Sequence, residues 1–144
     1  MKILFIGNSR LGDAILSTPI INHYNKKKNK ITVVCSSLSS QIYSSFNAVD
    51  KLIVLEKKKL GRHWLQAYLQ LESSKWDIVI DLRNSVLSRL VRKKKVFRFI
   101  NKNKNSHKVE QYCDLINLKS IKSPVIQTNI FFQKSTNNLI QKQK

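Results

Sequence analysis

A short polar loop near the N-terminus carries the residue types best suited to chemistry. It directly follows the apolar run Ile3–Ile6 and reads Gly-Asn-Ser-Arg-Leu-Gly-Asp, from Gly7 to Asp13. Glycine at two of its positions permits tight turns and close approach of a ligand to the backbone. The second glycine precedes Asp-Ala rather than Lys-Ser or Lys-Thr, which excludes a P-loop. The spacing of the two glycines likewise excludes the Gly-x-Gly-x-x-Gly dinucleotide fingerprint.

Asp13, the last residue of this loop, has two interpretations. At the start of a helix a carboxylate interacts favourably with the helix dipole, typically by about 0.3–1 kcal/mol. At the carboxyl-terminal edge of a sheet it can act as a general base that takes a proton from a substrate hydroxyl. The residues around Asp13 leave both interpretations open. For a base, we expect a carboxylate that is exposed to a cleft, with no dedicated cation neutralising it.

The elements that position this loop follow from hydrophobic periodicity. Short apolar runs predict strands at Ile3–Ile6, Ile31–Cys35, Leu52–Leu55, Asp77–Leu82 and Val96–Ile100. Apolar residues recurring every three or four positions predict helices at Leu11–Tyr24, Leu38–Phe46, Trp64–Leu71, Ser85–Val91 and Ser106–Leu118. This alternation predicts one doubly wound α/β domain with a parallel sheet, whose ligands bind outside the carboxyl ends of the strands.

Further charged residues fall near the predicted strand ends. Arg83 follows the strand that ends at Leu82, so it is either a second contact for a bound anion or a solvated loop residue. Asp77 and Asp81 flank the same strand and are interpreted as turn and strand-end residues rather than as catalytic ones.

Two basic clusters receive different interpretations. Lys57–Lys59, with Arg62, follows the third predicted strand on the expected ligand side, where it either attracts anionic lipid or phosphate or forms a solvated surface. Arg92–Lys95 precedes a strand and is interpreted as surface at the opposite edge.

The sequence predicts neither a capping box at the start of the last helix nor a metal site. Ser106 and Glu110 are four apart, one position too many for a capping box. The three His show no ligand spacing with Cys or carboxylates, so no metal site is expected. Cys35 and Cys113 are too few for a disulfide scaffold and are expected to be buried free thiols.

The chain is strongly basic. Its 144 residues include 27 Lys and Arg against 8 Asp and Glu, a formal net charge of +19. This balance excludes an acidic, calcium-buffering protein and favours a polyanionic partner such as nucleic acid, a phosphorylated substrate or an anionic membrane. Much of the excess positive charge comes from Lys residues interleaved with Asn. AT-rich genomes also encode Lys and Asn frequently at unconstrained surface positions. The charge is therefore either functional or compositional.

Targeting signals are not evident in the sequence. A signal peptide needs an apolar core of roughly 7–15 residues, and a membrane-spanning helix needs about 20. We find no such stretch in the sequence. A cytoplasmic location is expected, with at most peripheral contact with the inner face of the cytoplasmic membrane.

Three segments in order resemble the heptosyltransferase family, glycosyltransferase family 9. The first is Ile3–Ile6 with Arg10–Pro19, in which Gly-Asp, an apolar stretch and Thr-Pro follow the strand. The second, Trp76–Ser85, is similar to the family's aromatic-Asp-hydrophobic-Asp strand, and the third, His107–Tyr112, to its His-x-x-Glu helix. Together they cover about residues 1–118.

This resemblance implies the N-terminal, acceptor-binding half of a two-domain enzyme of the GT-B type, with facing Rossmann-like halves. Asp13 falls on the family's catalytic base, which deprotonates the acceptor hydroxyl in an inverting displacement. Ser9, Arg10 and Gly12 line the acceptor pocket in this interpretation, and Arg83 is a further candidate contact. The acceptor is a lipopolysaccharide core or a similar cell-envelope glycan.

The resemblance also implies that no cofactor is needed, because the donor is a nucleotide sugar such as ADP-heptose bound by the C-terminal half. That half's Asp-x-Gly-x-x-His motif does not occur here. We therefore expect a domain at residues 1–120, then a tail or interdomain segment at 121–144, loosely packed from Val125 onward. The chain is expected to be a fragment, a truncated product or half of a split enzyme, inactive alone without a donor domain or partner chain.

Two rival interpretations remain. The net charge suggests a basic nucleic-acid-binding α/β module, although the basic residues lack the aromatic interleaving of an RNA-binding sheet. The other rival is an inactive gene fragment.

Overall fold

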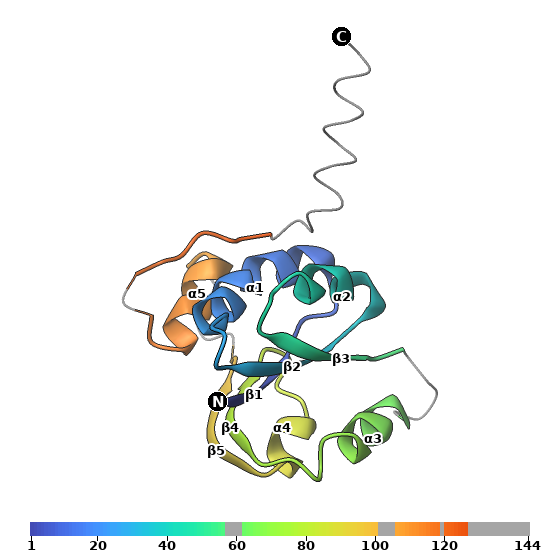
Figure 1. Cartoon of the computed structure of the whole chain (residues 1–144). Helices are drawn as coiled ribbons and strands as arrows, with labels where there is room; N and C mark the ends of the chain where they lie inside the picture. Colours follow the sequence, from blue (N-terminus) through green and yellow to red (C-terminus); the bar gives the residue numbers. More distant parts are fainter. Residues whose placement is uncertain (57–61, 101–105, 119, 127–144) are drawn as a thin grey trace.

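A single five-stranded sheet forms the centre of the protein. The computed structural model describes residues 1–56, 62–100, 106–118 and 120–126. The strands are β1 (Lys2–Ile6), β2 (Lys30–Cys35), β3 (Val49–Val54), β4 (Trp76–Asp81) and β5 (Lys93–Arg98), in the order β3-β2-β1-β4-β5. Every neighbouring pair is parallel, which confirms the predicted sheet (Figure 1).

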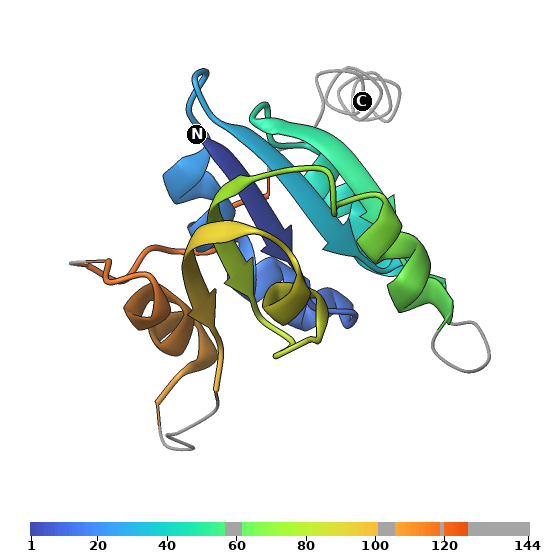
Figure 2. The same ribbon diagram turned by 90° about the horizontal axis from the view of Figure 1, so that it is seen from below.

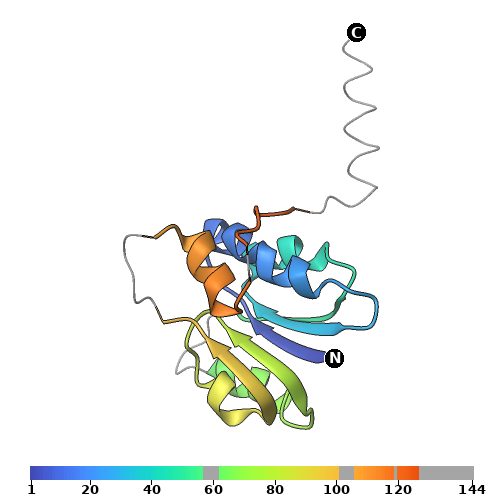
Figure 3. The same cartoon turned by 90° about the vertical axis from the view of Figure 1, so that its left-hand side faces the viewer.

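Helices cover both faces of this sheet, as a doubly wound fold requires. Within the described residues, α1 (Leu11–Tyr24), α2 (Ser37–Ser44) and α5 (Lys108–Leu115) lie on one face. Helices α3 (Arg62–Leu69) and α4 (Leu87–Leu90) lie on the other, and Figure 3 shows the three layers from the side. The architecture is thus a Rossmann-like α/β domain.

Strand β1 divides its side chains between two cores. Ile3 and Phe5 join the cluster beneath α1, α2 and α5, whereas Leu4 and Ile6 join the cluster beneath α3 and α4. All four are almost completely buried. A strand covered on both faces needs apolar residues at every position, which explains why this run shows no polar alternation.

The start of β5 differs from its prediction. The strand begins at Lys93 rather than at Val96, so Lys93–Lys95 belong to the strand and do not precede it. β5 is an edge strand, where Lys side chains can reach solvent and discourage pairing with other chains. Lys94 also forms an ion pair with Asp77, with 2.7 Å between Nζ and Oδ1. Hydrophobicity alone therefore underestimated the strand.

Helix α4 is shorter than the predicted Ser85–Val91 helix. Asp81 is fully buried at the end of β4 and accepts hydrogen bonds from the backbone N–H groups of Arg83 (2.9 Å) and Ser85 (2.6 Å) and from the Ser85 hydroxyl (3.0 Å). Asn84 lies between these residues with a φ of 49°, a left-handed conformation that Asn tolerates better than most residues. The carboxylate therefore holds a turn where the periodicity predicts helix, and it bears out the interpretation of Asp81 as a turn residue.

Helix α5 has a capping box that the sequence prediction missed. The N-cap is His107 rather than Ser106, so Glu110 stands three residues after it. The Val109 N–H donates to His107 Nδ1 at 3.4 Å, and the His107 N–H donates to Glu110 Oε2 at 3.3 Å. The expectation of no capping box was wrong because it placed the N-cap one residue too early, at Ser106 rather than His107.

Gly7 lies against a buried aromatic ring, and this contact leads to a paired prediction. A Cβ at Gly7 would lie 2.9 Å from two ring-end atoms of Tyr43, which is fully buried and hydrogen-bonded to Ser17. We expect Gly7→Ala to lower the free energy of unfolding by about 1–3 kcal/mol through overpacking. A Cβ at Gly12, in α1, meets nothing within 4 Å, so Gly12→Ala should be neutral or stabilising by up to about 1 kcal/mol. Urea denaturation of both variants provides the measurement, and equal losses would contradict it.

The end of the described chain lies on the α1 face. The Val125 N–H donates to Thr18 Oγ1 at 2.9 Å. We expected loose packing from Val125 to Lys144. Residues 127–144 of that segment lie outside the described residues. Among the helices that the structure describes, none has the length and apolar character needed to cross a bilayer.

Candidate active site

The loop after β1 lies at the carboxyl end of the central strand and is tied to its neighbours. The Gly7 N–H donates to the Val34 carbonyl of β2 at 2.9 Å. Two hydroxyls at the start of α2 bind loop carbonyls: Ser39 donates to Asn8 O at 3.1 Å, and Ser36 donates to Ser9 O at 2.9 Å. These bonds fix the path of the backbone that leads into α1.

Asp13 lies in the first turn of α1, beyond this anchored loop. Its side chain keeps 23% of its surface exposed. Lys108, on α5, donates from Nζ to Asp13 Oδ1 at 2.9 Å and is itself 39% exposed. The expectation that no dedicated cation neutralises this carboxylate was therefore wrong. The ion pair could not be predicted from local sequence patterns, because Asp13 and Lys108 are 95 residues apart.

Two further side chains connect this loop to α5, and the sequence analysis did not identify either. Asn8 donates from Nδ2 to the Tyr112 hydroxyl at 2.8 Å. Burial raises the pKa of Tyr112 to about 12, and the negative charge of Asp13 also raises it. The Tyr112 hydroxyl therefore stays protonated at neutral pH.

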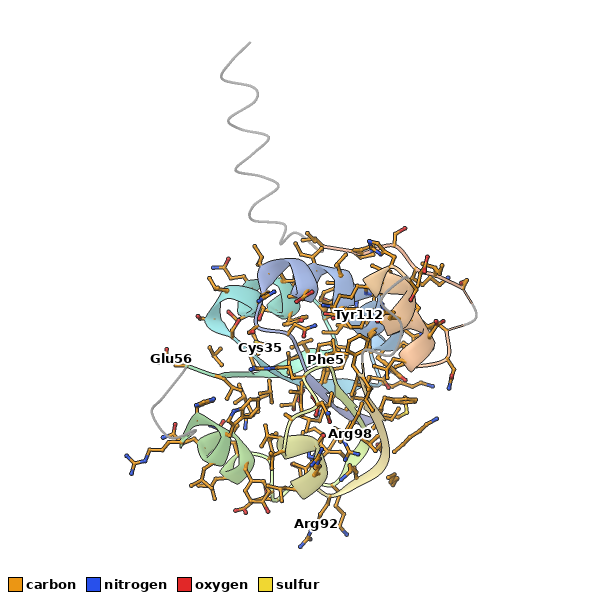
Figure 4. The ribbon with its side chains drawn as sticks, turned by 180° about the vertical axis from the view of Figure 1, so that it is seen from behind. Phe5, Cys35, Glu56, Arg92, Arg98 and Tyr112 are labelled. Carbon is orange, nitrogen blue, oxygen red and sulfur yellow. The ribbon has the colours of Figure 1, made fainter. Side chains whose placement is uncertain are left out.

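Tyr112 lies in the core layer between the sheet and the helices, on the same side as Phe5 (Figure 4). Lys108 and Tyr112 are four residues apart on α5 and therefore share one helix face. This spacing is the signal that could have linked the two residues in the sequence.

The other candidates from this loop are exposed to solvent. Ser9, Arg10 and Gly12 are all exposed, and the space beside Gly12 is open. An exposed guanidinium such as that of Arg10 has the donors to contact an anionic group.

Arg83 lies apart from this group. Its guanidinium carbon is 4.9 Å from the centre of the Trp64 ring on α3, the geometry of a cation–π contact. The side chain thus turns toward the α3–α4 side of the sheet. Its role as an acceptor contact stays a prediction.

The remaining polar candidates lie outside this site. Asp77, at the start of β4, has a lowered pKa because Lys94 and the Lys2 backbone N–H donate hydrogen bonds to it. Cys35 and Cys113 are buried free thiols, as expected, and burial raises the pKa of Cys35 to about 11. Across the described residues, no group of three or more His, Cys, Asp or Glu is arranged to hold a metal ion.

Comparisons with known proteins add information about the fold. No family model matches the chain, and a search of curated proteins finds no significant match. Among solved structures, a family 9 glycosyl transferase from Veillonella parvula matches 99% of this chain and 49% of its own, with a TM-score of 0.72 at 20% identity. E. coli heptosyltransferase WaaC with ADP-2-deoxy-2-fluoro heptose matches 90% of this chain and 51% of its own (TM-score 0.63, 20% identity). E. coli ADP-heptose LPS heptosyltransferase II matches 97% and 50%, respectively (TM-score 0.62, 17% identity).

These matches confirm the resemblance in fold that the three sequence segments predicted. The chain spans about half the length of each matched structure, which is consistent with a single N-terminal domain. The chain is therefore a Rossmann-like α/β domain with the fold of half a glycosyltransferase of the heptosyltransferase type.

Proposed function

We propose that this chain is the acceptor-binding half of a glycosyltransferase that transfers a sugar from a nucleotide sugar to a cell-envelope glycan. One observation carries the proposal: the Asp13 carboxylate is partly exposed just after the carboxyl end of the central strand. Ligands of open α/β sheets bind at this edge. The likeness in fold to glycosyltransferases supports the same class of reaction.

In this proposal Asp13 is the general base. It accepts the proton of an acceptor hydroxyl while the oxygen attacks the anomeric carbon of the donor sugar. The bond from that carbon to the nucleoside diphosphate breaks, the electron pair leaves with the diphosphate oxygen, and the configuration inverts. Lys108 contacts Oδ1, which the criterion for a base did not anticipate, so in this proposal Oδ2 is the oxygen that takes the proton.

The substrates follow from the site's charge and from the matched proteins. Arg10, exposed three residues before Asp13 in the chain, is suited to phosphate or carboxylate groups on the acceptor. Two matched structures are named heptosyltransferases, one of them an ADP-heptose LPS heptosyltransferase. We therefore propose a phosphorylated lipopolysaccharide-core glycan as acceptor and a nucleotide sugar such as ADP-heptose as donor, bound by a second domain or chain.

The binding half of this proposal can be tested on the chain alone. Calorimetric titration with a phosphorylated core oligosaccharide should give saturable binding, and the dephosphorylated glycan should bind more weakly. The complete reaction requires the chain joined to a donor-binding domain and an assay of sugar transfer.

A parallel titration with nucleic acid tests the rival interpretation, a nucleic-acid-binding module. Stacking platforms for bases need exposed aromatic rings, and every aromatic side chain within the described residues is buried or half-buried. Tight binding to nucleic acid, with a salt dependence of several charges and no glycan affinity, would contradict the proposed function.

A further inference from the structure

An open apolar groove lies between α3 and α4, on the face of the sheet opposite α1 and α5. Its volume is about 470 Å³, and apolar side chains form both walls. These are Trp64, Leu65 and Tyr68 from α3, and Val86, Leu87 and Leu90 from the α4 region. Figure 2 shows the two helices in front of the sheet.

The rims of this groove expose large apolar side chains to solvent. Leu65 is 61% exposed, Val86 62% and Leu90 55%. A helix on the surface of a soluble domain normally directs polar residues outward and apolar residues toward the core. Clustered apolar exposure beside a groove marks an interaction surface rather than the scattered apolar exposure of ordinary surfaces. We call this surface, formed by residues 62–69 and 83–92, the α3–α4 face.

The charged residues within the α3–α4 face itself are all basic. Residues 62–69 and 83–92 contain no Asp, Glu or Lys, and their charged residues are Arg62, Arg83, Arg89 and Arg92. Arg62, Arg89 and Arg92 are exposed, and Figure 4 shows Arg92 pointing away from the ribbon beyond α4. Arg83 lies at the groove itself, over Trp64.

One wall of the groove is anchored to the sheet. Arg98 of β5 donates from Nε to the Ser88 hydroxyl at 3.0 Å and from Nη2 to the Ser88 carbonyl at 3.2 Å. These bonds tie the short helix α4 to the sheet. The apolar side chains of α4 are therefore presented on a supported element.

We infer that the α3–α4 face docks on the surface of an anionic lipid bilayer. Leu65, Val86 and Leu90 enter the boundary between headgroups and acyl chains, while the surrounding Arg side chains contact lipid phosphates. An apolar centre with a basic rim fits that layered chemistry. A second copy of the chain fits poorly, because it would bring two basic faces together.

The position of this face relative to Asp13 relates membrane docking to acceptor binding. This step rests on the proposed function. Arg83 follows β4, and β4 pairs directly with β1, whose carboxyl end carries the Asp13 loop. Docking would therefore place the acceptor-binding edge of the sheet near the bilayer. A glycolipid acceptor anchored there could present its sugar to Asp13.

Vesicle sedimentation tests the inference without any sugar substrate. The full chain is mixed with phosphatidylcholine vesicles that contain or lack phosphatidylglycerol. We expect partitioning onto the anionic vesicles, part of it persisting in high salt because apolar insertion is not screened. Leu65→Gln combined with Leu90→Gln should lower the partition coefficient roughly tenfold or more, because two apolar side chains no longer enter the lipid.

The matched control is Leu38→Gln. Leu38 is 71% exposed on α2, which covers the opposite face of the sheet. We expect this variant to partition like the original chain. Equal losses in both variants, or binding that disappears completely in high salt, would overturn the inference and indicate attraction by net charge alone.

Two further readouts separate the remaining outcomes. Vesicles with brominated acyl chains should quench Trp64, which lines the groove, and sedimentation without quenching would overturn the inference. Light scattering without lipid detects self-association. A dimer that the double Leu variant dissociates would identify a second copy as the occupant. Because no assay here involves sugar transfer, loss of docking and loss of glycan binding are separately measurable.

Discussion

Asp13→Asn, introduced into the chain joined to a donor-binding domain, is expected to reduce turnover by roughly 10²–10⁴-fold, the usual contribution of a positioned base. Asparagine keeps the size and hydrogen-bonding capacity of the side chain but cannot accept the proton. Acceptor affinity should stay nearly unchanged, because Ser9, Arg10 and Gly12 are untouched. Initial rates of sugar transfer and calorimetric acceptor binding provide the two measurements.

The alternative role of Asp13 predicts the opposite pattern. A carboxylate that only stabilises α1 and pairs with Lys108 contributes about 0–1 kcal/mol at this partly exposed position. Lys108→Met removes the ion pair and keeps Asp13, so its unfolding curve measures the structural share. Near-normal turnover in Asp13→Asn, with a stability loss equal to that of Lys108→Met, would end the catalytic assignment.

Asp81→Ala should produce the largest loss of stability among these variants. Three donors converge on the buried Asp81 carboxylate, namely the N–H groups of Arg83 and Ser85 and the Ser85 hydroxyl. Alanine leaves these donors without their acceptor, and an unsatisfied buried donor costs about 1–3 kcal/mol. Because Arg83 N is only partly buried, we expect a total loss of about 2–4 kcal/mol in the free energy of unfolding. Urea denaturation is the measurement.

Asp77→Ala is the matched control for this experiment. Asp77 lies near the other end of the same strand, and its carboxylate is solvent-accessible in its pair with Lys94. We expect a much smaller shift of the unfolding midpoint for this variant. Asp81→Asn, which keeps one acceptor oxygen, should fall between the two. If Asp81→Ala unfolds no more easily than Asp77→Ala, the turn after β4 is held by other contacts.

The parallel sheet could be predicted because its inner strands carry an unusual signal. β1 is apolar at four consecutive positions since both of its faces are buried. No such run marks the start of β5, where Lys93–Lys95 occupy an edge strand. Apolar content therefore predicts central strands better than edges. The late start of α4 escaped prediction for a different reason, because hydrogen bonds to Asp81 hold Arg83 and Ser85 in a turn that periodicity does not reveal.

Only part of the candidate site could be predicted from the sequence. The loop that carries Asp13 is contiguous, so its residue types could be recognised together. Its partners Lys108 and Tyr112 come from α5, and only the folded chain brings α5 beside α1. Their pairing depends on the strand order, which local patterns do not encode.

The placement of β1 at the centre of the sheet has a consequence for biosynthesis. The first strand to leave the ribosome pairs with β2 on one side, but its other edge stays open until β4 at Trp76–Asp81 has been made. Through that interval the nascent chain exposes an unpaired strand edge that is apolar from Ile3 to Ile6, which is the kind of template that recruits other chains. Release of a chain interrupted between β3 and β4 would yield an aggregation-prone half-sheet. Chaperone dependence should accordingly be greatest between the emergence of β2 and the emergence of β4 from the ribosome.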